Sequence, residues 1–263
     1  MNHERTRERS SEYSRLTIDE VREAGRKIVS ILGLTTFPVG VRFAADAITP
    51  TDALRLESHR YCQALMLARH GQFVVLDEEG IACPAAADAF GFRPLPEGLR
   101  SGKGLVGFGI VSDPAVGRRM FEGMPRLASG EIHHLELFPL EEADRIPHVV
   151  VVEGEVEQLM WIVLSCLHAT GGQRVTASTA VLQATCVDAT IIPFLEKRLN
   201  FGFGCYGCRD ATDLAAGESI IGFPVAFLAS IVTHLEYLKD NAIPTSRGKK
   251  AWRALGKSKS KDK

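Results

Sequence analysis

The sequence predicts an α/β (or α+β) fold: a single compact unit of two similar βα-rich halves, with disordered termini. Strand-like apolar runs alternate with helix-like apolar periodicity over residues 16–241, so helices are expected to cover the faces of a sheet. With 263 residues, of which 45% are apolar, the chain can bury a sizeable core. The order helix, Gly-Gln, strand, turn, Cys also occurs twice, as HGQFVVLDEEGIAC (70–83) and GGQRVTASTAVLQATC (171–186).

The first half, residues 16–140, begins with a predicted helix. Residues 17–20 read Thr-Ile-Asp-Glu, the form of a capping box, and apolar residues at helical spacing then continue to Gly33. Residues 37–43 alternate apolar side chains after a proline, which predicts a strand. This half therefore opens as helix followed by strand.

Two cysteines follow in the first half. Cys62 lies on the apolar face of a helix predicted from Arg60 to Gly71, and a short buried strand is expected next at 73–76. Cys83 directly precedes Pro84, and proline is favoured at the first position of a helix. Cys83 is therefore expected to cap a helix.

The second half, residues 141–241, shows the same order of parts. Its predicted elements are a strand at 147–152, a helix at 156–167, a strand at 174–177 and a last helix at 225–235. Cys186 is followed by small residues, as Cys83 is, and the two are expected to be equivalent. Cys166 lies in a helix that is apolar on all sides, and its expected role is structural.

The segment FGFGCYGCRD (201–210) concentrates the chemistry of the chain. Gly204 permits a tight turn, and Cys205 and Cys208 stand at C-x-x-C spacing beside the permanent charge of Arg209. The next segment, ATDLAAGES (211–219), is predicted to be a short helix, and thiols at its start would have a lowered pKa, which favours the thiolate. The segment can be a metal or iron–sulfur site, a redox dithiol, or a structural glycine turn with unreactive buried thiols.

Several segments resemble an uncharacterised prokaryotic family catalogued as domain of unknown function 169. They are PVGVRF (38–43), YCQALMLARHGQFVVLDEEGIACPAAADAFGF (61–92), HLELFPLEEA (134–143), the GCxGCR stretch (204–209) and IIGFP (220–224). The resemblance covers about residues 32–238 and implies a shared fold with a cysteine-centred site, but no settled activity. The family pattern there is closer to Gly-Cys-x-Gly-x-Arg, so Cys208 is an addition of this chain.

The first functional hypothesis is a cytoplasmic protein with a redox or electron-transfer accessory role. Its thiolates would bind an iron–sulfur cluster, with Cys62, Cys83, Cys186 and Cys205 as preferred ligands and Cys208 as a further candidate. Zinc uses the same thiolates and stays an alternative cofactor. A redox partner protein would then be expected. The residues name no reaction, so enzymatic activity stays open.

The alternative hypothesis is a non-catalytic module that binds a small molecule or anion between the two halves, with structural cysteines and no cofactor. Helix N-termini and Arg209 would hold the ligand, with Gly204 and Gly207 allowing a close approach of the backbone. A third possibility is thiol chemistry at Cys205 with Cys208 as resolving partner.

Charge and composition restrict the partners. Residues 247–263 hold eight Lys/Arg against one Asp, a charge of +7, which leaves −8 for the rest of a chain whose net charge is −1. Nucleic acid is therefore not expected as a partner except through the basic tail, 242–263. Residues 1–15 are polar, lack a secretory signal and are expected to be a disordered arm. A membrane span is not expected, reduced cysteines fit a cytoplasmic location, and the oligomeric state is open.

Overall fold

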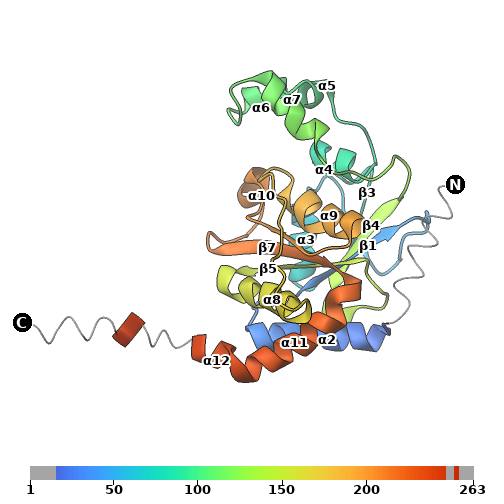
Figure 1. Cartoon of the computed structure of the whole chain (residues 1–263). Coiled ribbons are helices and arrows are strands. Elements are labelled where there is room, and N and C mark those ends of the chain that lie inside the picture. Colours follow the sequence, from blue (N-terminus) through green and yellow to red (C-terminus); the bar gives the residue numbers. More distant parts are fainter. Residues whose placement is uncertain (1–15, 247–251, 255–263) are drawn as a thin grey trace, which may run out of the picture.

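A single mixed sheet organises the chain. The computed structural model describes residues 16–246 and 252–254. In that part of the chain, seven strands lie in the order β2-β3-β4-β1-β5-β7-β6 (Figure 1). They are β1 (Val39–Ala44), β2 (Leu54–Arg55), β3 (Val74–Asp77), β4 (His134–Pro139), β5 (Val149–Glu155), β6 (Asn200–Gly202) and β7 (Glu218–Pro224). The predicted α/β class and single compact unit are confirmed.

Helices cover both faces of this sheet (Figure 1). One face is covered by α2 (Ile18–Leu32), α8 (Val156–Ala169) and α11 (Leu228–Asn241), followed by α12 (Ile243–Ser246). The other face carries α3 (Tyr61–Arg69), α4 (Pro84–Ala89), η2 (Ala184–Ile191), α9 (Ile192–Glu196) and α10 (Tyr206–Ala211). A helical lobe, residues 90–133, adds α5 (Glu97–Arg100), α6 (Lys103–Gly107) and α7 (Pro114–Glu122) above this second face. Short 3-10 turns follow β4 and β7, namely η1 (Leu140–Glu142) and η3 (Val225–Phe227).

Alternation along the strands divides the apolar residues into two cores. Val149 and Val151 of β5 pack on the α3 face, whereas Val150 and Val152 pack on the face covered by α2, α8 and α11. Successive strand residues point to opposite faces, so a strand buried on both sides must be apolar throughout. Among the residues that the structure describes, none of the helices combines the length and the apolar character that a membrane span requires.

The two halves of the sheet have the same topology. From the centre outwards, β1, β4 and β3 pair antiparallel in the first half, and β5, β7 and β6 do so in the second. At the centre, Gly40 pairs with Val150, and the register on either side of this pair is symmetric. An approximate two-fold axis through that pair and normal to the sheet therefore relates the halves. Such an axis leaves equivalent loops on the same face of the sheet.

Equivalent backbone contacts support this relation. Strand β4 ends in Phe138-Pro139 and β7 ends in Phe223-Pro224, and each is followed by a 3-10 turn. Leu140 N donates to Pro38 O at 2.8 Å, and Val225 N donates to His148 O at 3.0 Å, at matching positions. The predicted similarity of the halves is therefore present in the strand order and in the local hydrogen bonds.

The alignment of the two halves drawn from the sequence is wrong in its details. The strand predicted at 174–177 is absent, because residues 171–181 are largely exposed and bury too few apolar side chains to join the sheet. The strand equivalent to β3 is β6, since both pair with the middle strand of their half. Cys83 is therefore equivalent to Cys205, and not to Cys186.

The ends of the chain lie mostly outside the described residues. This holds for the predicted arm at 1–15 and for most of the basic tail predicted at 242–263. Within the described part, Ile243 is buried against the α2, α8 and α11 core, so the packed body continues past residue 241. Trp252 is exposed.

Candidate functional site

Four cysteines occupy two pairs of equivalent positions. Cys83 and Cys205 each follow an equivalent strand, β3 or β6, and each is the extended residue that precedes a short helix, with φ −79° and −84°. Cys62 and Cys186 lie in the first turn of α3 and η2, the helical segments that lead into those two strands. The two-fold relation therefore places one thiol pair from each half on the same face of the sheet.

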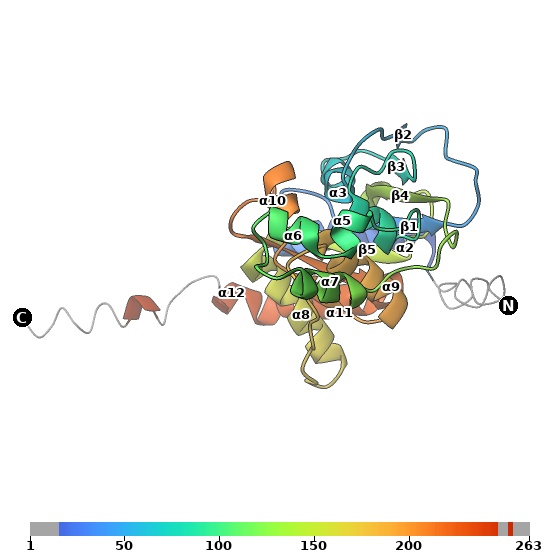
Figure 2. The ribbon, with the colours of Figure 1, turned by 90° about the horizontal axis from the view of Figure 1, so that it is seen from above.

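All four thiols line one cleft of about 610 Å³, called here the thiol cleft. It lies between the body of the protein and the helical lobe, which Figure 2 shows from above over this face of the sheet. The predicted grouping of Cys62, Cys83, Cys186 and Cys205 is therefore present in the structure. Cys166 packs on the opposite face of the sheet, away from this group, as expected.

Cys208 joins the group from below. It is fully buried, and its sulfur lies 2.7 Å from Thr185 Oγ1. Its backbone N–H donates to Cys205 Sγ at 3.2 Å, and the nearby thiols of Cys205 and Cys62 both influence its pKa. Cys208 is absent from the lining of the cleft. It connects the two half-sites under the four lining thiols.

Burial raises the pKa of three of the thiols that line the cleft. It raises the pKa of Cys83, although the N–H groups of Ala86 and Ala85 at the start of α4 lower it. Burial also raises the pKa of Cys186 well above its ordinary value, and nearby thiols add to the effect. The hydrogen bond with Cys208 and burial raise the pKa of Cys205. The lowering of the pKa expected for thiols at a helix start comes from backbone N–H groups at Cys205 and at Cys83, but it is smaller than the effect of burial. The helix predicted at 211–219 is wrong in position, because the short helix is α10 and Cys205 is its N-cap.

The pKa of Cys208 is also raised. A hydrogen bond with Cys205 lowers it, but a hydrogen bond with Cys62 and burial prevail and raise the pKa to about 12.

The donor set of several thiols suits a soft metal or cluster. Within the described residues, no group of three or more His, Cys, Asp or Glu side chains is placed to hold a metal ion. Binding of a metal would therefore require the thiols to move closer together.

The side chain of Arg209 binds the backbone of its own loop. Its guanidinium donates to the carbonyls of Phe203, Ala215 and Glu218, with Nη1 3.0 Å from Ala215 O and Nη2 2.7 Å from Glu218 O. Gly204 has φ +78°, the left-handed region that favours glycine. Arg209 and Gly204 therefore fix the loop that carries Cys205. The Arg209 N–H groups that were expected to bind an anion donate to backbone carbonyls of the protein instead.

Gly207 has a different role, which involves a residue that sequence reasoning did not identify. Arg60 Nη1 donates to Gly207 O at 2.8 Å, and a Cβ at Gly207 would lie 2.8 Å from that same nitrogen. Arg60 lines the thiol cleft and lowers the pKa of Cys83 by its charge, against the larger effect of burial. Its position two residues before Cys62, at the cap of α3, was the available signal.

A buried tyrosine joins the helical segments that carry Cys62 and Cys186. Tyr61 is 1% exposed, and its hydroxyl lies 2.9 Å from Thr190 Oγ1 of η2. Thr190 Oγ1 in turn donates to Thr185 O at 2.8 Å. Burial raises the pKa of Tyr61, so the phenol stays neutral. This chain of hydrogen bonds fixes α3 against η2 beneath the thiols.

A second buried network lies at the other end of α3. Arg69 Nη1 is 3.0 Å from Glu153 Oε2 of β5, and both side chains are 5% exposed. Arg69 Nη2 also lies 3.4 Å from carboxylate oxygens of Glu218 and Asp213. Burial raises the pKa of Glu153 to about 7, although the Arg69 charge lowers it. This network ties α3 to the centre of the sheet.

Comparisons with known proteins name a family but no activity. The chain is 27% identical over 230 residues to a protein of Methanocaldococcus jannaschii called uncharacterized protein MJ0308, a match that covers 85% of this chain and 97% of that protein. No solved structure matches the chain. Residues 27–234 match the family described as "DUF169: Uncharacterised ArCR, COG2043". Because the family model covers most of the chain, the chain belongs to the DUF169 family.

Proposed function

We propose that the protein binds an iron–sulfur cluster, or another thiophilic metal, through Cys62, Cys83, Cys186 and Cys205, and serves a redox or electron-transfer accessory role. The observation that supports this proposal is that two equivalent pairs of thiols, one from each half of the sheet, line a single cleft. Four thiolates are the ligand set of common iron–sulfur clusters and of structural zinc.

The protonation of the thiols is consistent with a ligand role. Burial raises the pKa of Cys83 and Cys186, so neither is an activated nucleophile in the metal-free protein. A bound metal reverses this preference, because a coordinating thiol is deprotonated by the charge of the ion. Loading is therefore expected to release protons and to draw the two half-sites together.

Cys208 is assigned a supporting role. It is buried under the cleft and contacts Cys205 through its backbone N–H. Hydrogen bonds to ligand sulfurs tune the potential of a cluster and fix its ligands. Replacement of Cys208 by serine should therefore weaken or shift the metal centre without abolishing it.

Anaerobic purification tests the proposal. The protein should carry iron with acid-labile sulfide and show the broad visible absorption of a cluster, or carry zinc without colour. Cys83→Ser and Cys205→Ser should abolish the bound metal. Cys166→Ser is the matched control, because that thiol is on the opposite face, and it should keep the full metal content. Metal-free protein after anaerobic purification and reconstitution would contradict the proposal.

The alternative, binding of a small molecule without a metal, is favoured by one observation. The thiol cleft has a volume of about 610 Å³, within the range of small-molecule sites. In that case the serine variants of Cys62, Cys83, Cys186 and Cys205 should bind a small molecule in the cleft as well as wild type does.

A further inference from the structure

The helical lobe breaks the two-fold symmetry above the thiols. Between α4 and β4 the chain has 44 residues, 90–133, whereas the equivalent connection between α10 and β7 has six, 212–217. Segments that connect the elements of a rigid scaffold often carry binding residues. The lobe therefore forms one side of the thiol cleft that has no counterpart in the second half.

The lobe gives the thiol cleft an apolar wall. Its side chains in the lining include Leu99, Leu105, Phe108, Ile110 and Phe121, with Leu182 opposite. Leu105 and Phe121 are anchored in the same core as Cys186, at 4% and 3% exposure. Phe108 is 69% exposed and stands at the open side. A folded lobe with an unfilled apolar surface facing the thiols fits an apolar ligand body.

One cation lies at this apolar cleft. Among the described lining residues, Arg60 is the single Lys or Arg and Asp210 is the single acidic residue, and both are exposed. The Arg60 charge acts on the Cys83 thiol, whereas Asp210 is not among the groups that shift that pKa. One of the Arg60 N–H groups binds Gly207 O, which orients the guanidinium and leaves its other donors for an anion.

We infer that the thiol cleft binds a small organic molecule with an apolar body and one anionic group, the body against the helical lobe and the anionic group at Arg60. The inference rests on the proposed function in one respect, namely that the group this molecule contacts at the thiols is the proposed metal centre. The binding itself is a separate property and is tested apart from any metal.

Two dyes of similar shape test the assignment by titration calorimetry on the protein as isolated. Anilinonaphthalene sulfonate has an apolar body with one anion, and phenylnaphthylamine has nearly the same body without charge. The sulfonate should bind at one site per chain. Arg60→Gln should weaken the sulfonate about tenfold, the loss expected for one charge-assisted contact, and leave the neutral dye unchanged.

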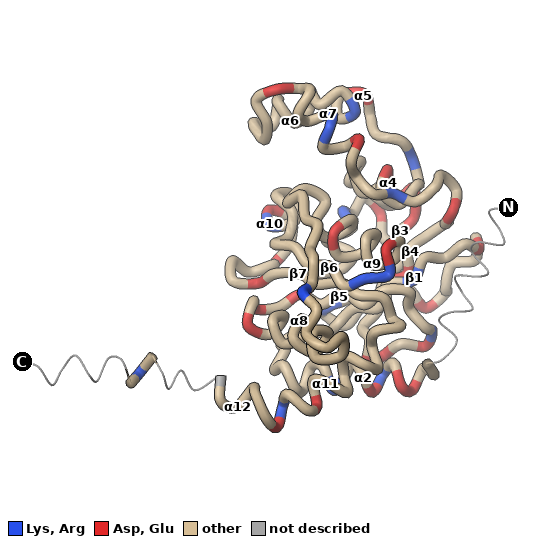
Figure 3. Tube along the Cα trace, in the orientation of Figure 1, with Lys and Arg blue, Asp and Glu red and all other residues tan. Residues whose placement is uncertain are grey.

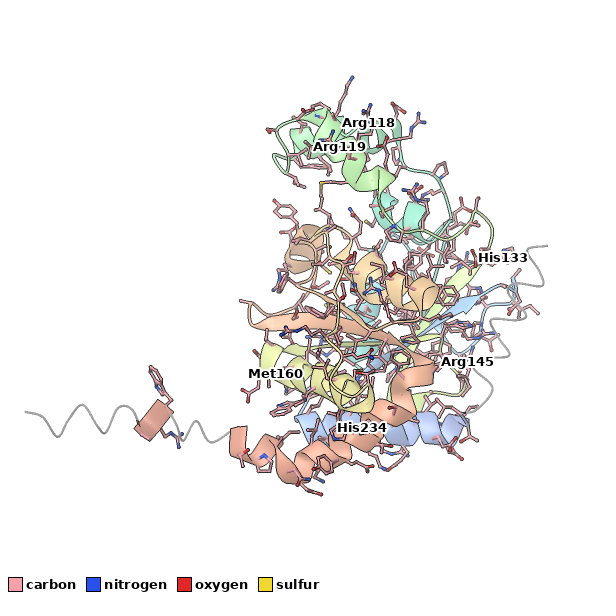
Figure 4. All side chains as sticks on the ribbon, viewed as in Figure 1. Arg118, Arg119, His133, Arg145, Met160 and His234 are labelled. Atoms are coloured by element: carbon pink, nitrogen blue, oxygen red, sulfur yellow. The ribbon has the colours of Figure 1, made fainter. Side chains whose placement is uncertain are left out.

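Two further variants make the test specific. Arg119→Gln removes the same charge from an exposed position on α7 (Figure 4), outside the lining of the cleft, and should change neither affinity. Both signs of charge are present on the lobe (Figure 3), so the loss of one surface cation there should have little effect. Ile110→Trp should fill the cleft and abolish binding of both dyes, with folding checked by circular dichroism.

The inference is overturned if neither dye binds saturably, if a folded Ile110→Trp keeps both affinities, or if Arg60→Gln affects the two dyes equally. Metal analysis of the same samples separates this inference from the proposed function. Metal-free protein that binds the sulfonate through Arg60 upholds the ligand site and contradicts the cluster. Iron-loaded protein that binds neither dye upholds the cluster and contradicts the ligand site.

Discussion

Arg60 and Gly207 connect the two half-sites across the thiol cleft. Arg60 Nη1 donates to Gly207 O at 2.8 Å, so the residue that caps the Cys62 helix contacts the loop between Cys205 and Cys208. The absence of a side chain at Gly207 allows this approach, since an added Cβ would lie 2.8 Å from the same nitrogen. This contact joins the two segments that carry thiols from separate halves of the chain.

Gly207→Ala tests the contact. The clash is with the end of a flexible side chain, so the free energy of unfolding should fall by only about 1 kcal/mol or less. The amount of metal that the variant retains should fall clearly below that of wild type, because the Arg60 guanidinium must leave its place between the two half-sites. Urea unfolding and metal content of the same samples measure the two effects. Equal retention by wild type and variant would show that the contact does not position the thiols.

Tyr61→Phe tests the connection beneath the thiols. The variant keeps the buried ring and loses only the hydroxyl that contacts Thr190 Oγ1 at 2.9 Å. Thr190 keeps its bond to Thr185 O, so no donor is left without a partner, and the cost should be about 1 kcal/mol. Tyr61→Ala should cost about 3 to 5 kcal/mol because it also leaves a cavity. Chemical unfolding of both variants gives the comparison, and equal costs would mean that the ring packing is unimportant.

Glu153 should make stability depend on pH. Its pKa is about 7 in the folded protein, raised by burial from 4.5, so the folded state binds the proton more tightly. Stability should therefore be highest below the unfolded pKa and be lost as the pH rises from 4.5 through 7, by on the order of 3 kcal/mol. Glu153→Gln should remove this contribution.

The difference between wild type and Glu153→Gln is the quantity to measure. His148 acts in the opposite direction, because burial lowers its pKa to about 4, and its contribution is lost as the pH falls below 6.5. Asp188, with a pKa raised to about 6 by burial, acts in the same direction as Glu153. Thermal unfolding of both proteins at several pH values isolates the Glu153 contribution. Parallel curves would mean that Glu153 stays ionised with Arg69 throughout this range.

Much of this fold could be predicted from local signals. The capping box at Thr17 and Glu20, the alternation in β1 and the proline after Cys83 act through nearby residues, and each is present in the structure. Strand β6 was missed because its three residues, Asn200–Gly202, lie among glycines and join the sheet only through β7. Pairing of this kind depends on tertiary contacts that no short window of sequence contains.

The candidate site was only partly predictable, because some of its residues come together only through tertiary contacts. Cysteines can be counted, and a shared fold with two halves predicts that they meet. The apolar wall at Leu105 and Phe108 could not be identified, because each is ordinary in sequence and acquires its place when the lobe folds over the thiols. Arg60 had one signal, its position two residues before Cys62 at the start of a predicted helix. The charge of Arg209 was conspicuous in sequence, but its donors bind carbonyls of the same loop.

The equivalence of the two thiol pairs gives the last prediction. Cys83 and Cys205 cap helices after equivalent strands, and Cys62 and Cys186 lie in equivalent first turns, so a centre shared by both halves should depend on all four. Each single serine variant should lose metal to a similar degree. The double variant Cys83→Ser/Cys205→Ser should lose no more than either single variant, since one missing ligand already breaks a four-thiolate centre.

A centre held by one half alone would behave differently. In that case serine at Cys62 and Cys83 would abolish the metal while serine at Cys186 and Cys205 would leave it, or the reverse. Metal content and visible absorption of the four single variants, with Cys166→Ser as the control on the opposite face, distinguish the two arrangements. Dependence on one half only would contradict the shared site, because each half contributes two of the thiols that line the cleft.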